Sequence, residues 1–284
     1  MTAASTGTGT VLTRDGVMLA YERCPGPSPG VLFVHATGFC KEVWRPVASE
    51  MESDTSWVAI DQPGHGDSTR PPLPIHWSTI GEAVLDVLDA LGPHRVGVGH
   101  SAGGAALAMA ELARPGSFDH LVLIEPIIFP PPHERHEQSP LSRLATKRRS
   151  TFPTREAAIE NFTGKGPFAR WDRRVLDAYV DGALRAAASR LVLKCEPGIE
   201  AEFYRGGADH DTWDRLPSLD VPVSLLIGAD STTHHGRFVE DLAGRFRSAD
   251  LVVVEDATHF VPMERPDLIA TLVDDVIGTG SISA

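Results

Sequence analysis

Short apolar runs alternate with helical patterns along most of this chain, and few folds accommodate such a pattern. The runs are rich in Val, Ile and Leu, are bounded by turn residues, and predict strands at 17–21, 31–34, 57–60, 95–98, 121–124, 223–227 and 251–254. Helical patterns separate several of them, at 80–91, 102–113, 238–246 and 266–277. Unbroken apolar runs suit strands that are buried on both faces. The alternation therefore predicts an α/β fold, with a mostly parallel sheet wrapped by helices.

The first two strand candidates, 17–21 and 31–34, are joined by a loop that is rich in Pro and Gly. Such loops favour tight reversals of the chain. We therefore expect these two strands to form a hairpin at the start of the fold.

One long stretch interrupts the alternation between residue 124 and the strand at 223–227. It opens with a glutamate and several prolines and continues as helical segments near 141–150, 155–162 and 170–193, without a convincing buried strand. An insertion after the carboxyl end of a strand lies over the sheet edge at which open α/β folds bind ligands. We expect a core domain of residues 1–125 and 218–284, and a helical cap (lid) of residues 126–217.

The charge balance argues against two classes of partner. The chain has 26 Lys and Arg against 38 Asp and Glu, a formal charge of −12, which disfavours nucleic acid and anionic membranes. No apolar stretch is long enough to cross a bilayer, and the first ten residues do not resemble a signal peptide, so we expect a cytoplasmic protein. Its three scattered cysteines predict free thiols. The sequence gives no indication of the oligomeric state.

The sharpest motif is Gly99-His100-Ser101-Ala102-Gly103, directly after the strand at 95–98 and before the helix that begins near residue 102. This is G-x-S-x-G in a strand-turn-helix setting. A serine at such a turn is strained and needs small neighbours, which the surrounding glycines and alanines provide. A Gly- and Ser-rich turn can match the pattern by chance, but the flanking elements favour Ser101 as a catalytic nucleophile.

A serine hydroxyl needs a base, and His259 is the best candidate. It follows the strand at 251–254 through a short loop, which places it at the same edge of a parallel sheet as Ser101. The other histidines in loops and in the cap match no metal-site spacing, and we interpret them as surface residues: His133, His136, His210, His234 and His235. We expect neither a metal nor a cofactor.

At this point the chain resembles the α/β-hydrolase family, in its serine-nucleophile branch. Three further stretches, 35–39, 61–68 and 258–266, are similar to family segments in their usual order. The resemblance implies an oxyanion hole formed by the backbone N–H groups of Thr37 and Ala102, in which Ala36 stands where the family usually has glycine. Preorganised donors of this kind stabilise the charge that develops in the transition state.

Two acidic residues are candidates for the third member of the triad. Most relatives have a Gly-x-x-Asp arrangement after the strand that corresponds to 223–227, but here Gly228-Ala229-Asp230-Ser231 places the aspartate one residue early. Glu125 ends an apolar strand, where some haloalkane dehalogenases of the same fold place their acid, and glutamate is seldom buried unless it is paired. We favour Glu125 and keep Asp230 as the alternative.

These residues predict a serine hydrolase that cleaves a small, mainly neutral carboxylic ester, lactone or thioester through an acyl-enzyme. The alternatives are a cofactor-free perhydrolase, a hydrolase of C–C bonds, and a ligand-binding protein of this fold. Phe39, His100 and Phe129 are the expected pocket residues. We interpret the basic run 147–149 as a solvated helix face.

Overall fold

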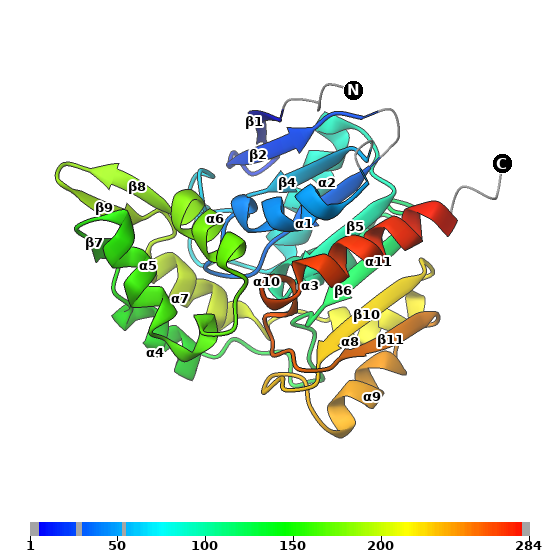
Figure 1. Cartoon of the computed structure of the whole chain (residues 1–284). Helices are drawn as coiled ribbons and strands as arrows, with labels where there is room; N and C mark the ends of the chain where they lie inside the picture. Colours follow the sequence, from blue (N-terminus) through cyan, green and yellow to red (C-terminus); the bar gives the residue numbers. More distant parts are fainter. Residues whose placement is uncertain (1–5, 27–29, 53–54, 280–284) are drawn as a thin grey trace.

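Eight strands form the central sheet of the computed structural model, which describes residues 6–26, 30–52 and 55–279. The strand order is β1-β2-β4-β3-β5-β6-β10-β11 (Figure 1). Their bounds are β1 Gly7–Leu12, β2 Met18–Cys24, β3 Val31–Val34, β4 Trp57–Ile60, β5 Val96–His100, β6 His120–Ile124, β10 Val223–Gly228 and β11 Ala249–Val254. The six strands from β4 to β11 in this order pair in parallel, whereas β2 is antiparallel to both β1 and β4.

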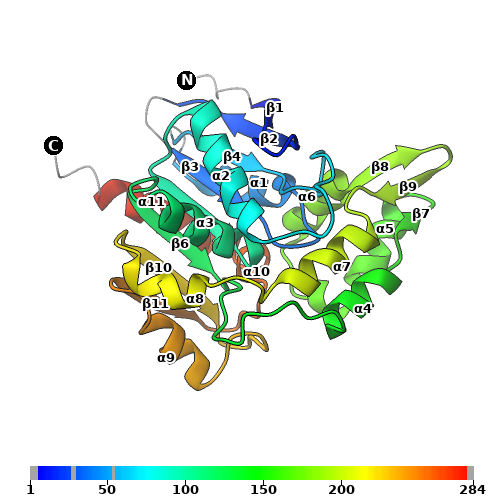
Figure 2. The same ribbon diagram turned by 180° about the vertical axis from the view of Figure 1, so that it is seen from behind.

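Helices cover both faces of this sheet (Figures 1 and 2). One face carries α2 (Ser78–Leu91), α3 (Ala102–Ala113) and α9 (Arg237–Ala243), and the other carries α1 (Arg45–Glu50) and α11 (Pro266–Thr279). Alternate side chains of a strand point to opposite faces, so Leu32 and Val34 of β3 enter the first core while Val31 and Phe33 enter the second. The predicted fold class, a mostly parallel sheet wrapped by helices, is confirmed.

The expected hairpin between the strands at 17–21 and 31–34 is wrong. β2 pairs instead with β1 and with β4, and β3 lies between β4 and β5. The sequence of β1, rich in Gly and Thr, gives little strand signal of its own. It forms because β2 offers a free edge, and Gly9 lies so close to the ring of Tyr21 that a side chain there would overlap it.

The strand at 251–254 is not buried on both faces. β11 is the last strand of the sheet, and Leu251 and Val253 are 38% and 48% exposed. The apolar run at 251–254 therefore reflects the strand preference of its three β-branched valines rather than complete burial.

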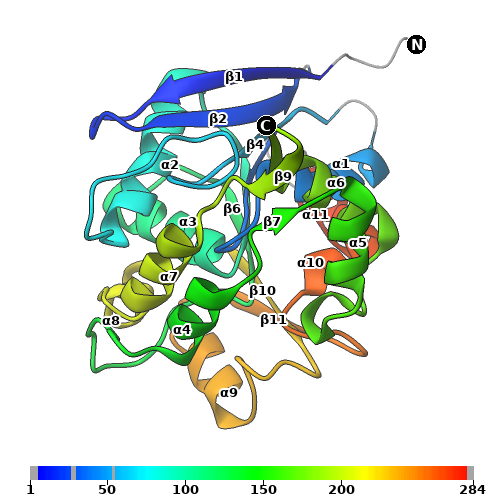
Figure 3. The same ribbon diagram turned by 90° about the vertical axis from the view of Figure 1, so that its left-hand side faces the viewer.

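The insertion between β6 and β10 contains helices α4 (Pro140–Lys147), α5 (Arg155–Thr163), α6 (Arg173–Ala183) and α7 (Pro197–Gly206). They stand together at one end of the sheet, and Figure 3 turns this side toward the viewer. After α7 the short helix α8 (Thr212–Arg215) returns to the core, where Trp213 packs. The division at residues 126 and 217 stays a prediction.

The insertion is not purely helical. The predicted helix at 170–193 ends at Ala183, and the chain continues as β8 (Leu184–Ala187) and β9 (Arg190–Leu193), which form a small antiparallel sheet with β7 (Thr151–Phe152). Ala188, at φ 53°, reverses the chain between β8 and β9. Residues 184–193 form a hairpin rather than a helix because β9 also pairs with β7. A local sequence pattern does not reveal this contact.

Candidate active site

Ser101 occupies a strained turn between β5 and α3. Its φ of 55° lies in the left-handed region, which a non-glycine residue adopts only where the surrounding structure enforces it. A Cβ on Gly99 would lie 2.6 Å from the carbonyl carbon of Gly103, and a Cβ on Gly103 would overlap the carbonyl oxygen of Val34. The two glycines therefore let α3 start directly against the ends of β5 and β3, with Ser101 at the junction.

His259 follows β11 and lies beside this turn. Its backbone carbonyl accepts a 2.8 Å hydrogen bond from Nε2 of His100, the residue before Ser101, and the two rings lie 5.1 Å apart between centroids. Burial lowers the pKa of His100 to about 3, so this ring is neutral and its one N–H serves that bond. His100 thus holds the His259 loop against the Ser101 turn.

Glu125 is fully buried at the end of β6, with φ 50°. Its Oε2 lies 2.8 Å from Nδ1 of His259 and accepts a 2.8 Å bond from the Ser231 hydroxyl, while Oε1 accepts a 2.9 Å bond from the Gly228 amide. Burial raises the pKa of this carboxyl, but the interactions with His234 and His259 outweigh it and lower the pKa to about 2. Glu125 is therefore an ionised carboxylate aimed at the His259 ring.

Asp230, the alternative acid, faces the cap. Its carboxylate accepts a 2.7 Å bond from Arg170, and its side chain is 55% exposed. Arg170 also donates to the carbonyl of Asp256. The structure thus brings Glu125, and not Asp230, to His259.

The loop that carries Thr37 lies directly after β3. Thr37 is buried, the Phe39 amide donates to the carbonyl of Ala36, and Gly38 turns the chain at φ 82°. Since Gly103 packs on the end of β3, the start of α3, with Ala102, lies against this loop. The two predicted oxyanion donors therefore come from neighbouring segments.

A buried ion pair between Lys41 and Asp61 holds the loop after β3 in place. Lys41, just beyond it, donates from its backbone N–H and from Nζ to the carboxylate of Asp61, at 2.7 and 2.8 Å. The Gln62 amide donates to Nε2 of His35 at 3.1 Å. These contacts tie the loop after β3 to the loop after β4, and they account for His35, Asp61 and Gln62 in the stretches 35–39 and 61–68.

Aromatic side chains form a wall above the Ser101 turn. Phe39 faces the His100 ring at 6.1 Å and meets two rings of the cap edge-on, Trp171 at 5.2 Å and Tyr179 at 5.6 Å. Phe260, beside His259, completes the group. Phe129, the third expected pocket residue, packs on His234 and Phe238.

Two residues that we interpreted as solvated differ from that expectation: His234 is buried and Arg148 is largely covered. His234 is 1% exposed, and its Nδ1 lies 2.8 Å from Glu125 Oε2, so its interpretation as a surface residue is wrong. Its only sequence signal is its place in the loop at the carboxyl end of β10. Arg148, from the basic run 147–149, donates at 2.5 Å to Glu200 and at 2.9 Å to the Tyr179 hydroxyl inside the cap, so the interpretation of the run as a solvated face is wrong for this residue, whereas Lys147 and Arg149 are exposed.

The side chains of Glu125, His234 and His259 offer ligand atoms within 4.8 Å of one another. A separation of this size suits a metal ion as well as a hydrogen-bonded cluster. The 2.8 Å contacts to the carboxylate are accounted for by protons alone, and we assign no metal to them.

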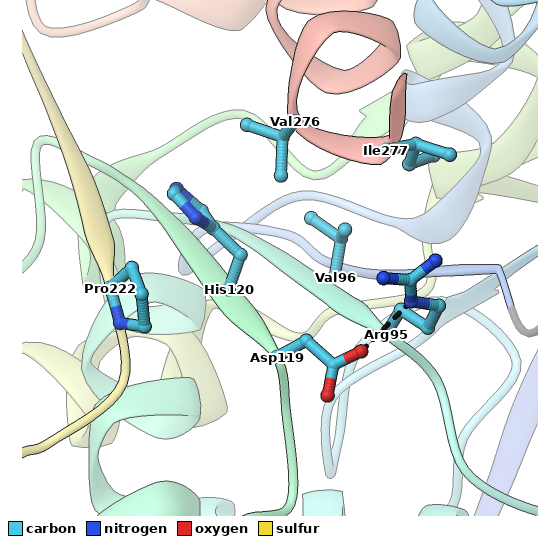
Figure 4. A pocket seen from close by; sticks show the side chains of 7 residues that line it. All are labelled: Arg95, Val96, Asp119, His120, Pro222, Val276 and Ile277. Atoms are coloured by element: carbon cyan, nitrogen blue, oxygen red, sulfur yellow. Dashed lines mark hydrogen bonds and ion pairs between the residues drawn. The ribbon is translucent and has the colours of Figure 1, made fainter. Parts of the chain in front are cut away.

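A separate pocket lies at the other end of the parallel strands, where their amino ends meet. It is lined by Arg95, Val96, Asp119, His120, Pro222, Val276 and Ile277 (Figure 4). Arg95 and Asp119 form a 2.8 Å ion pair on its rim. Val276 and Ile277 belong to α11, and the other lining residues lie at the amino ends of β5, β6 and β10, whereas ligands of such sheets bind at the carboxyl ends. Among the described residues, no helix has the length and apolarity to span a membrane.

Comparisons with known proteins agree on one family. The model of the alpha/beta hydrolase family matches residues 31–272. Monoacylglycerol lipase abhd6-B of Xenopus laevis is 23% identical over 266 residues, which cover 90% of this chain and 77% of the lipase. Esterase YbfF of Escherichia coli is 24% identical over 230 residues, 78% of this chain and 83% of the esterase. The structure of the peroxisomal alpha-beta-hydrolase Lpx1 of Saccharomyces cerevisiae superimposes with a TM-score of 0.83 at 19% identity, covering 99% of this chain and 89% of Lpx1.

Proposed function

The chain belongs to the alpha/beta hydrolase family, and on that premise we propose that it is a serine hydrolase that cleaves a small, mainly neutral carboxylic ester, lactone or thioester. The similarity to a lipase and to an esterase supports a general hydrolase role. The finer assignment depends on the residues of the site. The 2.8 Å contact between His259 Nδ1 and Glu125 Oε2, beside the strained turn of Ser101, is the observation that carries it.

In the proposed first step, Ser101 Oγ attacks the substrate carbonyl carbon while His259 Nε2 removes the hydroxyl proton. Glu125 holds the proton on Nδ1, so that Nε2 is free to accept, and its charge stabilises the imidazolium that forms. The backbone N–H groups of Thr37 and Ala102 stabilise the oxyanion. The imidazolium then protonates the leaving alcohol or thiol, and the acyl group stays on Ser101.

In the second step, water attacks the acyl carbonyl and gives a proton to His259. The tetrahedral intermediate collapses, the carboxylic acid leaves, and His259 returns the proton to Ser101. In each step His259 accepts one proton from the attacking group and donates one to the leaving group, and neither step needs a cofactor.

The wall of aromatic side chains favours a substrate with an apolar group next to the reacting carbonyl. Phe39, Trp171 and Tyr179 bring rings from the core loop and from the cap to the same place. Pockets of this kind are mainly apolar, with few polar groups. The formal charge of −12 offers no long-range attraction to anionic substrates, which is why we propose neutral ones.

Turnover of a short-chain nitrophenyl ester, together with labelling by a fluorophosphonate, tests this proposal. We expect turnover and one covalent adduct, mapped by mass spectrometry to Ser101, with both lost in Ser101→Ala. Ser78→Ala, at an exposed position, is the matched control and keeps both. If folded wild-type protein carries no fluorophosphonate adduct on Ser101, the mechanism is overturned. Labelling without turnover of any ester, lactone or thioester in a panel would leave the nucleophile in place and overturn the substrate class.

A further inference from the structure

Tyr179, in α6 of the insertion, is fully buried against the loop that follows β3. Its ring meets Phe39 edge-on at 5.6 Å between centroids, and its hydroxyl oxygen lies 3.4 Å from the backbone carbonyl oxygen of Gly38. The Cys40 thiol lies 3.9 Å from the backbone carbonyl oxygen of Tyr179. One residue of the insertion thus contacts three consecutive residues of the loop that carries Thr37, the proposed oxyanion donor.

The direction of the Tyr179 hydroxyl proton follows from its two neighbours. Arg148 Nη2 lies 2.9 Å from the hydroxyl oxygen, and a guanidinium carries only donors, so the hydroxyl accepts this bond. Its own proton is then left for the carbonyl oxygen of Gly38. Burial raises the pKa of Tyr179 to about 12, so the hydroxyl keeps that proton at neutral pH. Arg148 therefore directs the hydroxyl to donate to Gly38.

The ion pair of Arg148 and Glu200 lies directly on the same glycine. A Cβ added to Gly38 would lie 2.8 Å from Glu200 Oε1 and 3.3 Å from Arg148 Nη1. Arg148 Nη1 in turn donates at 2.5 Å to Glu200 Oε2. The guanidinium is thus held on one side by Glu200 and presents its other nitrogen to the Tyr179 hydroxyl.

The loop passes this contact on to Thr37 through two peptide groups. Gly38, at φ 82°, occupies a turn in which the Phe39 amide donates to the Ala36 carbonyl oxygen at 3.2 Å. The Gly38 carbonyl and the Phe39 N–H are the two ends of one planar peptide group, and so are the Ala36 carbonyl and the Thr37 N–H. Tyr179 orients the first group, and the turn bond orients the second, so that the Thr37 N–H points away from the turn.

The core supports the same carbonyl from the other side. The Gln62 amide donates to Nε2 of His35, and burial holds the pKa of His35 well below its usual value, so the one ring proton is on Nδ1. That N–H faces the Ala36 carbonyl oxygen at 2.7 Å. The turn therefore has one support from the core, His35, and one from the insertion, Tyr179.

We propose that Tyr179 is a positioning residue that holds the oxyanion loop from the insertion, with Arg148 directing its hydroxyl. The inference rests on the proposed function, in which the Thr37 N–H stabilises the oxyanion. Hydrogen bonds in a chain polarise one another, so the guanidinium at one end strengthens the N–H donor at the other. The oxyanion hole is thus complete only when the insertion is packed on the loop after β3.

Tyr179→Phe removes the hydroxyl and keeps the ring against Phe39. We expect kcat for a nitrophenyl ester to fall about tenfold, less than the roughly 10²–10³-fold loss of a whole donor, because His35 still supports the turn. KM should change by less than about twofold, since the aromatic wall is intact. The matching thionoester, whose sulfur is a weak acceptor, should lose less, so the preference for the carbonyl ester falls. Equal losses on both esters would mean that Tyr179 only packs.

Hydrogen exchange followed by NMR tests the same contact without turnover. We expect the Phe39 amide to exchange faster in Tyr179→Phe, by about threefold or more, because the turn opens more often. Tyr21→Phe, which removes a hydroxyl from β2, is the matched control and leaves exchange and kinetics unchanged.

Unchanged exchange at Phe39 in Tyr179→Phe would overturn the proposal, as would faster exchange with an unchanged kcat. If Ser101 is not labelled, the proposed function fails instead. The exchange rate then still decides whether Tyr179 holds the turn.

Discussion

The Ser231 hydroxyl donates a 2.8 Å hydrogen bond to Glu125 Oε2. Ser231 stands where most members of the family have an aspartate after this strand, and the aspartate of this chain, Asp230, is one residue away. The Ser231 hydroxyl and His259 Nδ1 thus contact the same carboxylate oxygen. The carboxylate beside His259 belongs to Glu125, at the end of β6, and not to a residue after β10. An acid moved from one strand end to its neighbour still reaches the same imidazole, because parallel strands end at one edge of the sheet.

Glu125→Gln should therefore abolish most of the activity, and Asp230→Asn should not. A glutamine at position 125 offers an N–H to His259 and disfavours the tautomer with a proton on Nδ1, for which we expect a loss in kcat of about 10³-fold or more. Asp230→Asn removes only an exposed ion pair with Arg170, and we expect kcat to stay within about threefold. Steady-state kinetics on one ester compares the two. The reverse order of effects would assign the acid to Asp230.

Gly103→Ala should damage both the fold and the site. The new methyl group would overlap the carbonyl oxygen of Val34, a backbone atom that cannot move aside without separating α3 from β3. Overpacking of this kind costs about 1–3 kcal/mol, and we expect such a loss in the free energy of unfolding together with a loss of turnover. Gly198→Ala, where nothing lies within 4 Å of the added carbon, is the control and should be neutral or slightly stabilising. Urea denaturation measures both, and equal stabilities would contradict the tight packing at Ser101.

The fold class and the turn at Ser101 were predictable because their signals are local. Apolar runs between turn residues identify buried strands, and five consecutive residues specify the strand-turn-helix junction. The strand pair β1–β2 was not predicted because β1, rich in Gly and Thr, has little strand signal of its own. The pair β8–β9 was not predicted because its residues continue the helical pattern of 170–193.

The site shows the same division. The register argument at Asp230 uses only adjacent residues, and it favours the glutamate that the structure places beside His259, whose catalytic role stays a prediction. The burial of His234 and the partial burial of Arg148 arise from contacts with residues at least 31 positions away in the sequence. In a single sequence, such residues look like ordinary polar loop or helix residues.

Acid should destabilise the protein through its buried neutral histidines. His65 is fully buried, with Nδ1 3.0 Å from the Pro63 carbonyl and its ring edge-on to Phe203, and burial lowers its pKa to about 4. The unfolded chain binds a proton there below about pH 6.5, and the folded chain does not until about pH 4. The free energy of unfolding therefore falls as the pH drops through this window.

His65→Gln should reduce that dependence by up to about 1.4 kcal/mol per pH unit, the value for one proton. Urea denaturation between about pH 4.5 and 6.5 gives the slope, which does not depend on any pH-independent cost of the substitution. His76→Gln, at an exposed position, should leave the slope unchanged. An unchanged slope in His65→Gln would mean that His65 binds its proton equally in the folded and unfolded states.

Arg148 and Glu200 should stabilise the protein as a pair rather than separately. Their side chains are only 16% and 8% exposed, the guanidinium donates to Glu200 at 2.5 Å, and the Glu200 carboxylate lies against Gly38 in the loop after β3. Arg148→Met leaves a buried carboxylate without its cation, which costs about 3–5 kcal/mol. Replacing both residues removes the unpaired charge, so the double variant Arg148→Met/Glu200→Met should be more stable than Arg148→Met alone.

A double-mutant cycle in urea measures this coupling, with Arg247→Met as the exposed control. Arg247 pairs with Asp220 at the surface, where both side chains are more than half exposed, and its loss should cost less than about 1 kcal/mol. Because Glu200 touches the loop that carries Thr37, we also expect kcat to fall in Arg148→Met more than in Arg247→Met. Additive effects of Arg148→Met and Glu200→Met on the free energy of unfolding would show that the two residues do not act as a buried ion pair. An unchanged kcat in Arg148→Met would show that this pair does not influence the loop that carries Thr37.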